Sequence, residues 1–239
     1  MVGGNQILQR KFAEQIRSQI KTWGVKPQNL RFHMLRIMLP LSTTQKSYNF
    51  KLGDKDSVAN VSPIGIESRL KTSSVFFGNL FSLGLFYTPV ASNVNNFGNG
   101  IYVTYPDKTL FSAASEAAAL ENVYNGFLTL KTDQDLRLDR LPTSVFRHVP
   151  RTQSAAASHP SDIDNFVDFS SALVFFGDRT NTATLEMEAT ADFTAINGSV
   201  TAGNGHANYL DLRIGGFEVV NGADNNRIID WYKTQRGDN

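Results

Sequence analysis

The first part of the chain has the hydrophobic pattern of an amphipathic helix. Between Asn5 and Trp23 the apolar residues recur at spacings of four and then three, which is the period of one helix face. Gly24 and then Pro27 follow, and both residues are typical of a helix stop. We therefore predict an N-terminal helical arm over residues 1–24. Its apolar face consists of Leu8, Phe12, Ile16, Ile20 and Trp23.

The other face of this helix is basic, with Arg10, Lys11, Arg17 and Lys21 against a single Glu14. Most helices of this kind pack on their own sheet with a solvated polar face. Such a helix can also extend from its domain and dock on a neighbouring subunit, a membrane surface or enclosed nucleic acid. In that second case the subunit contacts are Phe12, Ile16, Ile20 and Trp23, and the residues toward anionic material are Arg10, Arg17 and Lys21.

After residue 24 the pattern changes to short apolar runs separated by Gly, Asn, Asp and Pro. Several runs alternate between apolar and polar positions, as half-buried strands do. About ten short strands without alternating helices predict an antiparallel sandwich or barrel. The predicted strands are LRFHMLRIMLPL, SYNFKL, VFFGNLFSLGLFYTPV, GIYVTY, GFLTLKT, LRLDRL, SVFRHV, ALVFFG, ATLEMEATADF, YLDLRIGGFEVV and RIIDWYK.

Two further segments bear on the architecture. Ser112–Tyr124 is rich in alanine and begins with serine, which predicts one short additional helix. Arg151–Asn165 is small and polar and predicts a long exposed loop, but strand-like sequence resumes after it. We therefore expect an all-β, mainly antiparallel fold in which residues 25–239 form one β-sandwich domain.

The most apolar run, Val75–Val90, raises the question of a membrane span. It is interrupted by Asn79, Ser82 and Pro89 and is rich in residues that favour strands. A spanning helix needs ~20 mostly apolar residues, so this run predicts one or two buried strands instead.

Charge and composition narrow the classes of function. The 239 residues include 23 Lys and Arg against 22 Asp and Glu, a formal net charge of +1. This balance lacks the basic excess of a protein whose main task is to neutralise phosphates. The absence of cysteine excludes disulfides, thiolate nucleophiles and thiolate metal sites. The N-terminus lacks the pattern of a secretory signal, so we expect synthesis in the cytoplasm.

Three aspartates at close spacing, Asp133, Asp135 and Asp139, are the first candidates for chemistry. A helix-loop-helix calcium site would need glycine at its sixth position and glutamate at its twelfth, and neither is present. A hydrolase would need a carboxylate pair such as Asp133 and Asp139 across a cleft, which no sequence feature demands. A hairpin with its turn near Thr132–Asp135 accounts for the alternation on both sides. We interpret the aspartates as turn and surface residues.

The other polar motifs do not predict catalysis. The four histidines, His33, His148, His159 and His206, show no metal-ligand spacing. The run SHPSDID, Ser158–Asp164, holds Ser, His and Asp in one loop but lacks the context of a nucleophile elbow. We therefore predict no catalytic residue, no metal site, no cofactor, no small-molecule substrate and no enzymatic activity.

Aromatic residues near predicted loops leave one alternative function open. Phe97, Tyr102 and Tyr105 lie where an exposed ring can stack on a ligand. The alternative is a carbohydrate-binding or adhesin-like sandwich module that uses Tyr102 and Tyr105.

The runs ALENVYNGFLTLKTDQDLRLDRLPTSVFRHVPRTQ and, much later, NYLDLRIGGFEVV resemble virion structural proteins of tailless icosahedral bacteriophages in texture and segment order. The resemblance implies a jelly-roll-like β-sandwich and a capsid-type subunit that self-assembles into an icosahedral shell, located in the virion. The implied partners are copies of itself and other virion proteins, with the N-terminal arm against the genome or an internal membrane. A double jelly roll usually needs more than 239 residues, so single and double forms and an accessory role stay open.

Overall fold

The computed structural model describes residues 20–42, 44–52, 70–89, 101–103, 121–147, 166–190 and 206–236. These residues form nine strands and a C-terminal helix, with short helical turns between them. In chain order the elements are η1 (Pro27–Asn29), β1 (Leu30–Pro40), β2 (Ser47–Leu52), β3 (Val75–Pro89), β4 (Ile101–Val103), β5 (Phe127–Thr132), β6 (Asp135–Pro142), η4 (Thr143–Phe146), β7 (Val167–Phe176), β8 (Asn181–Glu186), β9 (His206–Val219) and α3 (Asn226–Arg236).

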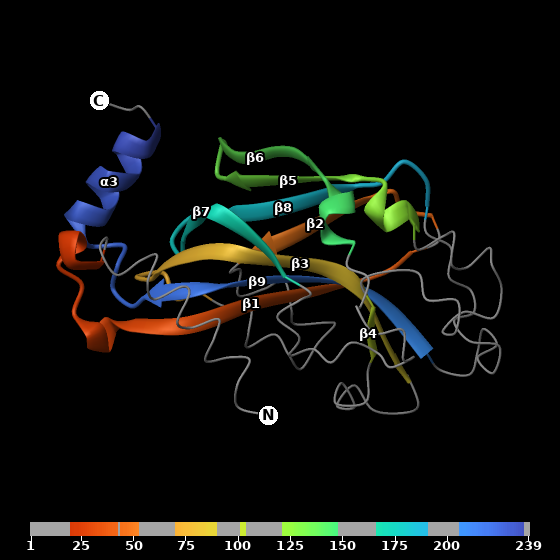
Figure 1. Cartoon of the computed structure of the whole chain (residues 1–239), viewed down its shortest axis with the longest axis horizontal. Coiled ribbons are helices and arrows are strands. Elements are labelled where there is room, and N and C mark those ends of the chain that lie inside the picture. The colour runs from red at the N-terminus through yellow and green to blue at the C-terminus, as the bar shows by residue number, and fades with distance from the viewer. Residues whose placement is uncertain are drawn as a thin grey trace.

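The strands form two sheets packed face to face (Figure 1). In the five-stranded sheet the order is β1-β9-β3. The other edge of β3 pairs with two strands: the first half of β3 pairs with β7, and the end of β3 pairs with β4. In the four-stranded sheet the order is β2-β8-β5-β6. All neighbouring strands are antiparallel, which confirms a mainly antiparallel β-sandwich.

Strand pairing is nested along the chain. The strand β1 pairs with β9, β2 with β8, β3 with β7, and β5 with β6. Pairs of the five-stranded sheet alternate with pairs of the four-stranded sheet until the β5–β6 hairpin closes the series. Most of the pairing is therefore between segments far apart in sequence.

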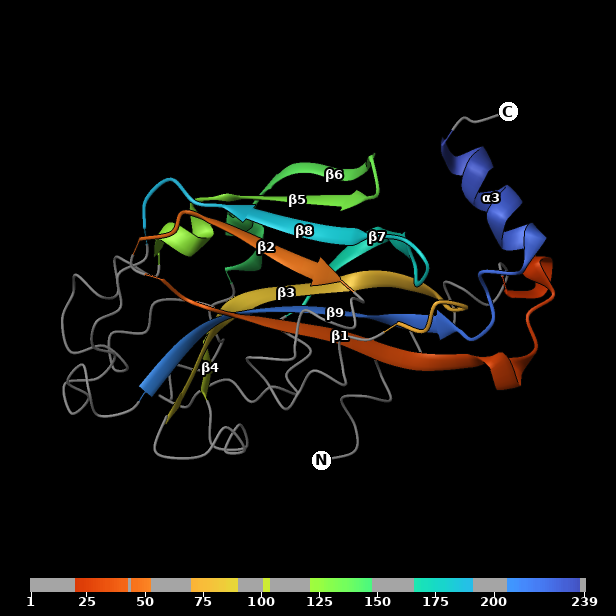
Figure 2. The same ribbon diagram turned by 180° about the vertical axis from the view of Figure 1, so that it is seen from behind.

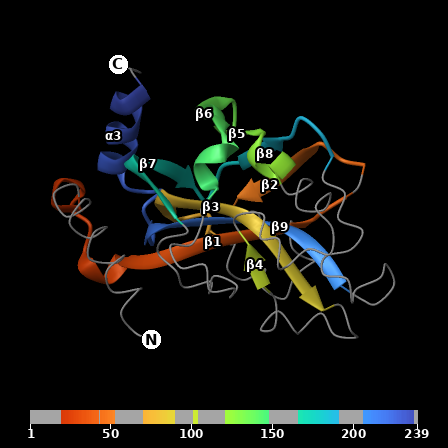
Figure 3. The ribbon, with the colours of Figure 1, turned by 45° about the vertical axis from the view of Figure 1, so that its right-hand side comes forward.

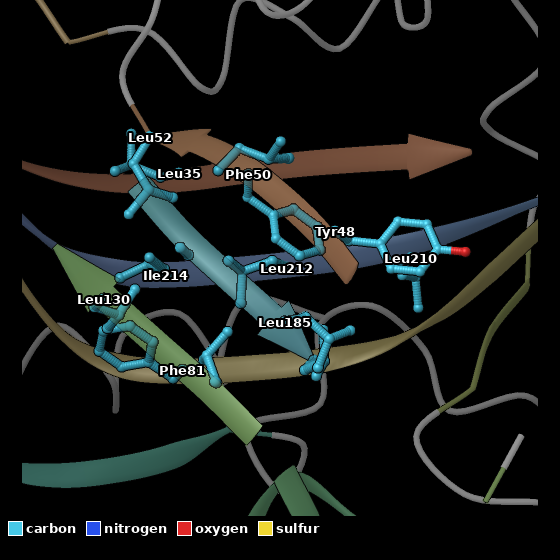
Figure 4. Close-up of a cluster of buried hydrophobic side chains, with 14 of the residues drawn as sticks. Leu35, Tyr48, Phe50, Leu52, Phe81, Leu130, Leu185, Leu210, Leu212 and Ile214 are labelled. Atoms are coloured by element: carbon cyan, nitrogen blue, oxygen red, sulfur yellow. The ribbon is translucent and has the colours of Figure 1, made fainter. Parts of the chain in front are cut away.

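The core lies between the two sheets and is filled by apolar side chains (Figure 4). In β2 the residues Tyr48, Phe50 and Leu52 are buried and alternate with exposed neighbours, as the sequence pattern predicts. Burial of one such side chain contributes about 1.5–3 kcal/mol. Figure 4 shows residues of the five-stranded sheet, among them Leu35, Phe81 and Leu212, meeting Leu130 and Leu185 of the four-stranded sheet.

Most predicted strands are confirmed. The apolar run from Val75 is one long strand, β3, and the predicted hairpin is β5 and β6 with a two-residue turn at Asp133 and Gln134. Asp133 has φ 52, in the left-handed region that Asp tolerates better than most residues. Its Oδ1 accepts a hydrogen bond from the backbone N–H of Thr180 (3.0 Å), so the turn also contacts the β7–β8 connection.

Two predicted strands are wrong. RIIDWYK is helical and belongs to α3, because Ile228 and Tyr232, four residues apart, are both buried and form one helix face. The adjacent isoleucines had favoured a strand. SVFRHV begins within η4, where the buried Thr143 donates its hydroxyl to the carbonyl oxygen of Val123 (2.6 Å) and so holds a tight turn.

The two predicted helices fall mostly outside the described residues. The last turn of the N-terminal helix, Ile20–Trp23, and the last turn of the second helix, residues 121–124, are helical. Residues 1–19 and 104–120 lie outside, as does the predicted loop Arg151–Asn165.

Candidate functional site

The root of the predicted arm belongs to the core of the domain. We define the arm root as Ile20–Val25. Trp23 is only 2% exposed, Ile20 packs against the same apolar cluster, and Lys21 is exposed. The other residues predicted for contacts, Phe12, Ile16, Arg10 and Arg17, lie outside the described residues, and their contacts with a neighbour stay a prediction.

Glycine ends the helical turn of the arm root. Gly24 has φ 65, a left-handed conformation that glycine adopts without steric cost. The N–H of Gly24 donates to the carbonyl oxygen of Lys21 and the N–H of Val25 to that of Ile20, at 3.2 Å each. These two bonds form a Schellman motif. The predicted helix stop at Gly24 is confirmed.

Asn225 joins the arm root to α3. Its Oδ1 accepts hydrogen bonds from the backbone N–H groups of Arg227 (3.0 Å) and Ile228 (3.4 Å), and so caps the first turn of α3. Its Nδ2 donates to the carbonyl oxygen of Trp23 (3.1 Å), one of the acceptors that a helix end leaves unpaired. One side chain therefore satisfies the end of one helix and the start of another.

Five aromatic residues form what we call the terminal cluster: Trp23, Phe77, Phe176, Trp231 and Tyr232. The Trp23 ring stacks on Phe77 with centroids 4.6 Å apart and meets Trp231 edge-on at 5.2 Å. Tyr232 meets Phe176 edge-on at 4.8 Å. Such pairs contribute about 0.5–1.5 kcal/mol each beyond the area that they bury. The cluster fixes the arm root and α3 to the face of β3 and β7 that points away from the sandwich core.

The same helix also contacts the four-stranded sheet. The guanidinium of Arg137, on β6, lies 4.3 Å from the ring centre of Tyr232, and that of Arg179, after β7, lies 5.7 Å from it. In Figures 1, 2 and 3 α3 stands beside the arm root at one end of the sandwich, while β4 lies toward the other end. Both ends of the described chain are thus held at one end of the domain.

A buried ion network lies on the outer face of the five-stranded sheet. Asp211 is fully buried, and its Oδ2 accepts hydrogen bonds from the Nη2 atoms of Arg36 and Arg213 at 2.7 Å each. Burial alone would raise the pKa of Asp211, but Arg213 and Arg36 outweigh it, so the pKa is lowered. The guanidinium of Arg36 also lies over the ring of Phe86, 4.8 Å from its centre. The network therefore joins β1, β9 and β3.

The three aspartates of the hairpin do not come together as an acidic site. Asp133 lies in the turn, Asp135 pairs with Arg137 at 3.4 Å, and Asp139 is exposed. Among the described residues no group of three or more His, Asp or Glu is arranged to hold a metal ion. Ser158–Asp164, Phe97 and Tyr105 lie outside the described residues; Tyr102 is in β4, opposite Phe86.

Sequence reasoning missed the residues that carry this arrangement. The asparagine before α3 and the helical spacing of Ile228 and Tyr232 are signals that could have identified the helix. The charged pair Asp211 and Arg213 alternates with core residues of β9, but nothing local in the sequence says that this outer face is buried.

Comparison of the chain with known protein families, curated proteins and solved structures finds no match. No helix within the described ranges is long and apolar enough to span a membrane.

Proposed function

We propose that this chain is a virion structural protein of capsid type, a jelly-roll subunit that self-assembles into an icosahedral shell. The observation that carries the proposal is the nested pairing of eight strands around a filled apolar interior. Without the short strand β4, the first strand pairs with the last, the second with the second to last, and so on inward. Each sheet then contains four of the eight strands. This order supports a single jelly roll, an architecture of viral coat domains that lectins and cupins share.

The filled interior favours a structural role over a ligand site inside the sandwich. An internal ligand site needs a cavity with a few convergent polar groups. Here Phe50, Phe81 and Phe175 have no exposed surface and belong to one apolar cluster between the sheets. The buried Glu218, at one end of β9 on the same side, is paired with Arg31. Contacts with partners are then made by the outer surfaces and by the arm.

The anchored arm root supports the predicted role of the arm. Trp23 and Asn225 fix the arm root, the first described part of the chain, to the domain. Because the arm root is already held in place, contact of the arm with a neighbour has less conformational freedom to restrict. Less conformational entropy is then lost on assembly. The proposed partners are copies of this chain and other virion proteins, with the basic face of the arm against the genome or an internal membrane.

Assembly of the purified protein tests the proposal. We expect light scattering over a concentration series, with electron microscopy of the largest species, to show discrete particles or small oligomers that grow into them. A monomer of 26.4 kDa at every concentration would refute it. A variant that lacks residues 1–19 keeps Trp23, so it should keep the wild-type melting temperature and yet assemble poorly. Normal assembly of this variant would refute the role of the arm.

The outer face of the four-stranded sheet favours a second candidate, the carbohydrate-binding module. Asn49 and Thr129 flank Thr184 in register, and together they form a row on the face opposite the core. The amide and hydroxyl groups of this row can form hydrogen bonds with the hydroxyl groups of sugars. Saturable glycan binding that Asn49→Ala abolishes would support this module. A negative glycan screen combined with particle assembly would exclude it.

A further inference from the structure

Three polar side chains meet on the core-facing side of the five-stranded sheet, at the end where the arm root enters β1. Arg31 and His33 belong to β1, and Glu218 lies opposite Arg31 on β9. Glu218 is fully buried, and its Oε2 accepts a hydrogen bond from Nε of Arg31 at 2.6 Å. Nδ1 of His33 lies 3.9 Å from the same oxygen.

The surroundings of His33 suit its neutral form. Its ring meets Phe76 edge-on with centroids 5.9 Å apart, and the residue opposite His33 on β9 is Gly216, so no side chain separates the imidazole from β3. Nε2 of His33 and Oε1 of Glu218 are buried without a hydrogen-bond partner. Burial lowers the pKa of His33 below its ordinary 6.5, Glu218 acts in the opposite direction, and Arg31 lowers it further.

We propose that His33 is a proton-sensitive latch for the arm root: protonation of His33 loosens the first half of β1 from β9 and leaves the second half paired. With His33 neutral, the charges of Arg31 and Glu218 cancel. Protonation adds a positive charge to this partly buried place, two residues from Arg31 on the same face of the strand. A carboxylate already paired with one guanidinium compensates this charge only in part, and Nε2 then carries an unpartnered N–H.

The rest of β1 is held independently. Arg36, in its second half, pairs with the buried Asp211, whose lowered pKa keeps it ionised in mild acid. The strand β1 is the outermost strand of its sheet, with β9 as its one neighbouring strand among those described. Its first half can therefore separate while every other strand pair persists.

Loosening at this place reaches the arm root directly. The strand begins at Leu30, which packs against the same buried apolar cluster as Trp23, and the N–H of Val220 donates to the carbonyl oxygen of Asn29 (2.7 Å). Because the pKa of His33 is lower in the folded state than in the unfolded chain, the stabilisation is fully present above about pH 6.5 and is lost as pH falls through the folded value.

Hydrogen exchange of the full chain, read by mass spectrometry at about pH 7.5 and about pH 5 and corrected for intrinsic rates, tests the latch. We expect protection of residues 30–34 to fall several-fold in acid while that of residues 209–214 persists. His33→Phe, which keeps an aromatic ring but cannot gain a proton, should remove the pH response. His206→Phe, at the other end of β9, should retain it.

A nuclear magnetic resonance titration of the His33 ring in the wild-type protein supplies a readout that needs no variant. A midpoint below 6.5 supports the latch, whereas a midpoint at or above 6.5 overturns it. An unchanged pH response in His33→Phe, or an equal loss of protection in both segments, also overturns it. If His33→Phe does not fold, His33→Gln takes its place and the titration still decides.

Discussion

Replacement of Asp211 by Asn should show how much the buried ion network contributes to stability. The substitution keeps the size of the side chain and removes its charge, so two guanidinium groups lose their shared counter-ion. Breaking a buried pair in this way costs about 3–5 kcal/mol. Because Arg36 retains 14% side-chain exposure and can be partly hydrated, we expect the lower end, about 3 kcal/mol.

Urea denaturation followed by tryptophan fluorescence measures this loss, since both tryptophans of the chain lie in the terminal cluster. With a slope of about 3 kcal/mol/M, a loss of about 3 kcal/mol moves the midpoint down by about 1 M. The matched control is Asp133→Asn, which removes the same charge from a pair with Arg179 at 3.9 Å in which both side chains are at least a third exposed. Because solvent screens this pair, the control should lose less than about 1 kcal/mol of stability.

The stabilisation by Asp211 depends on pH in a definite direction. The pKa of Asp211 is lowered in the folded state, so its stabilisation is present above the unfolded pKa, about 3.9, and is lost as pH falls through the folded value. The difference between wild type and Asp211→Asn should therefore stay constant from about pH 7 to about pH 5 and shrink only below about pH 4. A loss of less than 1 kcal/mol, equal to that of the control, would show that the network contributes no more than a surface pair.

The other predictions concern the arm root and one close backbone contact. Trp23→Ala should cost about 3–5 kcal/mol and lower the melting temperature by about 10 °C, while Lys21→Ala should leave it nearly unchanged; similar values for both would refute the anchor. Gly216→Ala should cost about 3 kcal/mol or more in a denaturation assay, because its Cβ would lie 1.9 Å from a backbone oxygen of β3. The adjacent Gly215→Ala, whose Cβ meets nothing closer than 3.4 Å, should be tolerated. A larger loss of stability for Gly215→Ala than for Gly216→Ala would contradict the register of β9 with β3. Asn225→Asp keeps the cap of α3 and loses the donor to the arm root, so fluorescence should report a loss of about 1 kcal/mol with unchanged helix content by circular dichroism.

Local patterns were sufficient for most of the strands and for one helix end. Alternation in Tyr48–Leu52 predicts a strand with one buried face, and the structure buries that face. The aspartates at 133–135 predict a turn, and Gly24 predicts a helix stop; both are found. These predictions succeed because a residue's own backbone preferences and those of its nearest neighbours decide the outcome.

The α3 segment shows where local reasoning fails. Its isoleucines favour a strand, yet the residues form a helix because that shape brings Ile228 and Tyr232 into one buried apolar cluster with Trp23 and lets Asn225 cap the first turn. The partners of Tyr232 come from β6, β7 and the connection after β7. Propensity is overridden here because burial of large aromatic side chains contributes more than the strand preference of two residues.

The sequence by itself determined most of the strands, which face of a strand such as β2 enters the core, and the helix stop at Gly24. Only the tertiary structure decided that the strands pair in a nested order, that Trp23 stacks on Phe77 and Trp231, and that Asp211 and Glu218 are buried beside arginines. The physical reason is the distance along the chain between the residues that interact. Alternation depends on neighbours in the chain, whereas pairing and burial of charge depend on groups that meet only when distant segments are brought together.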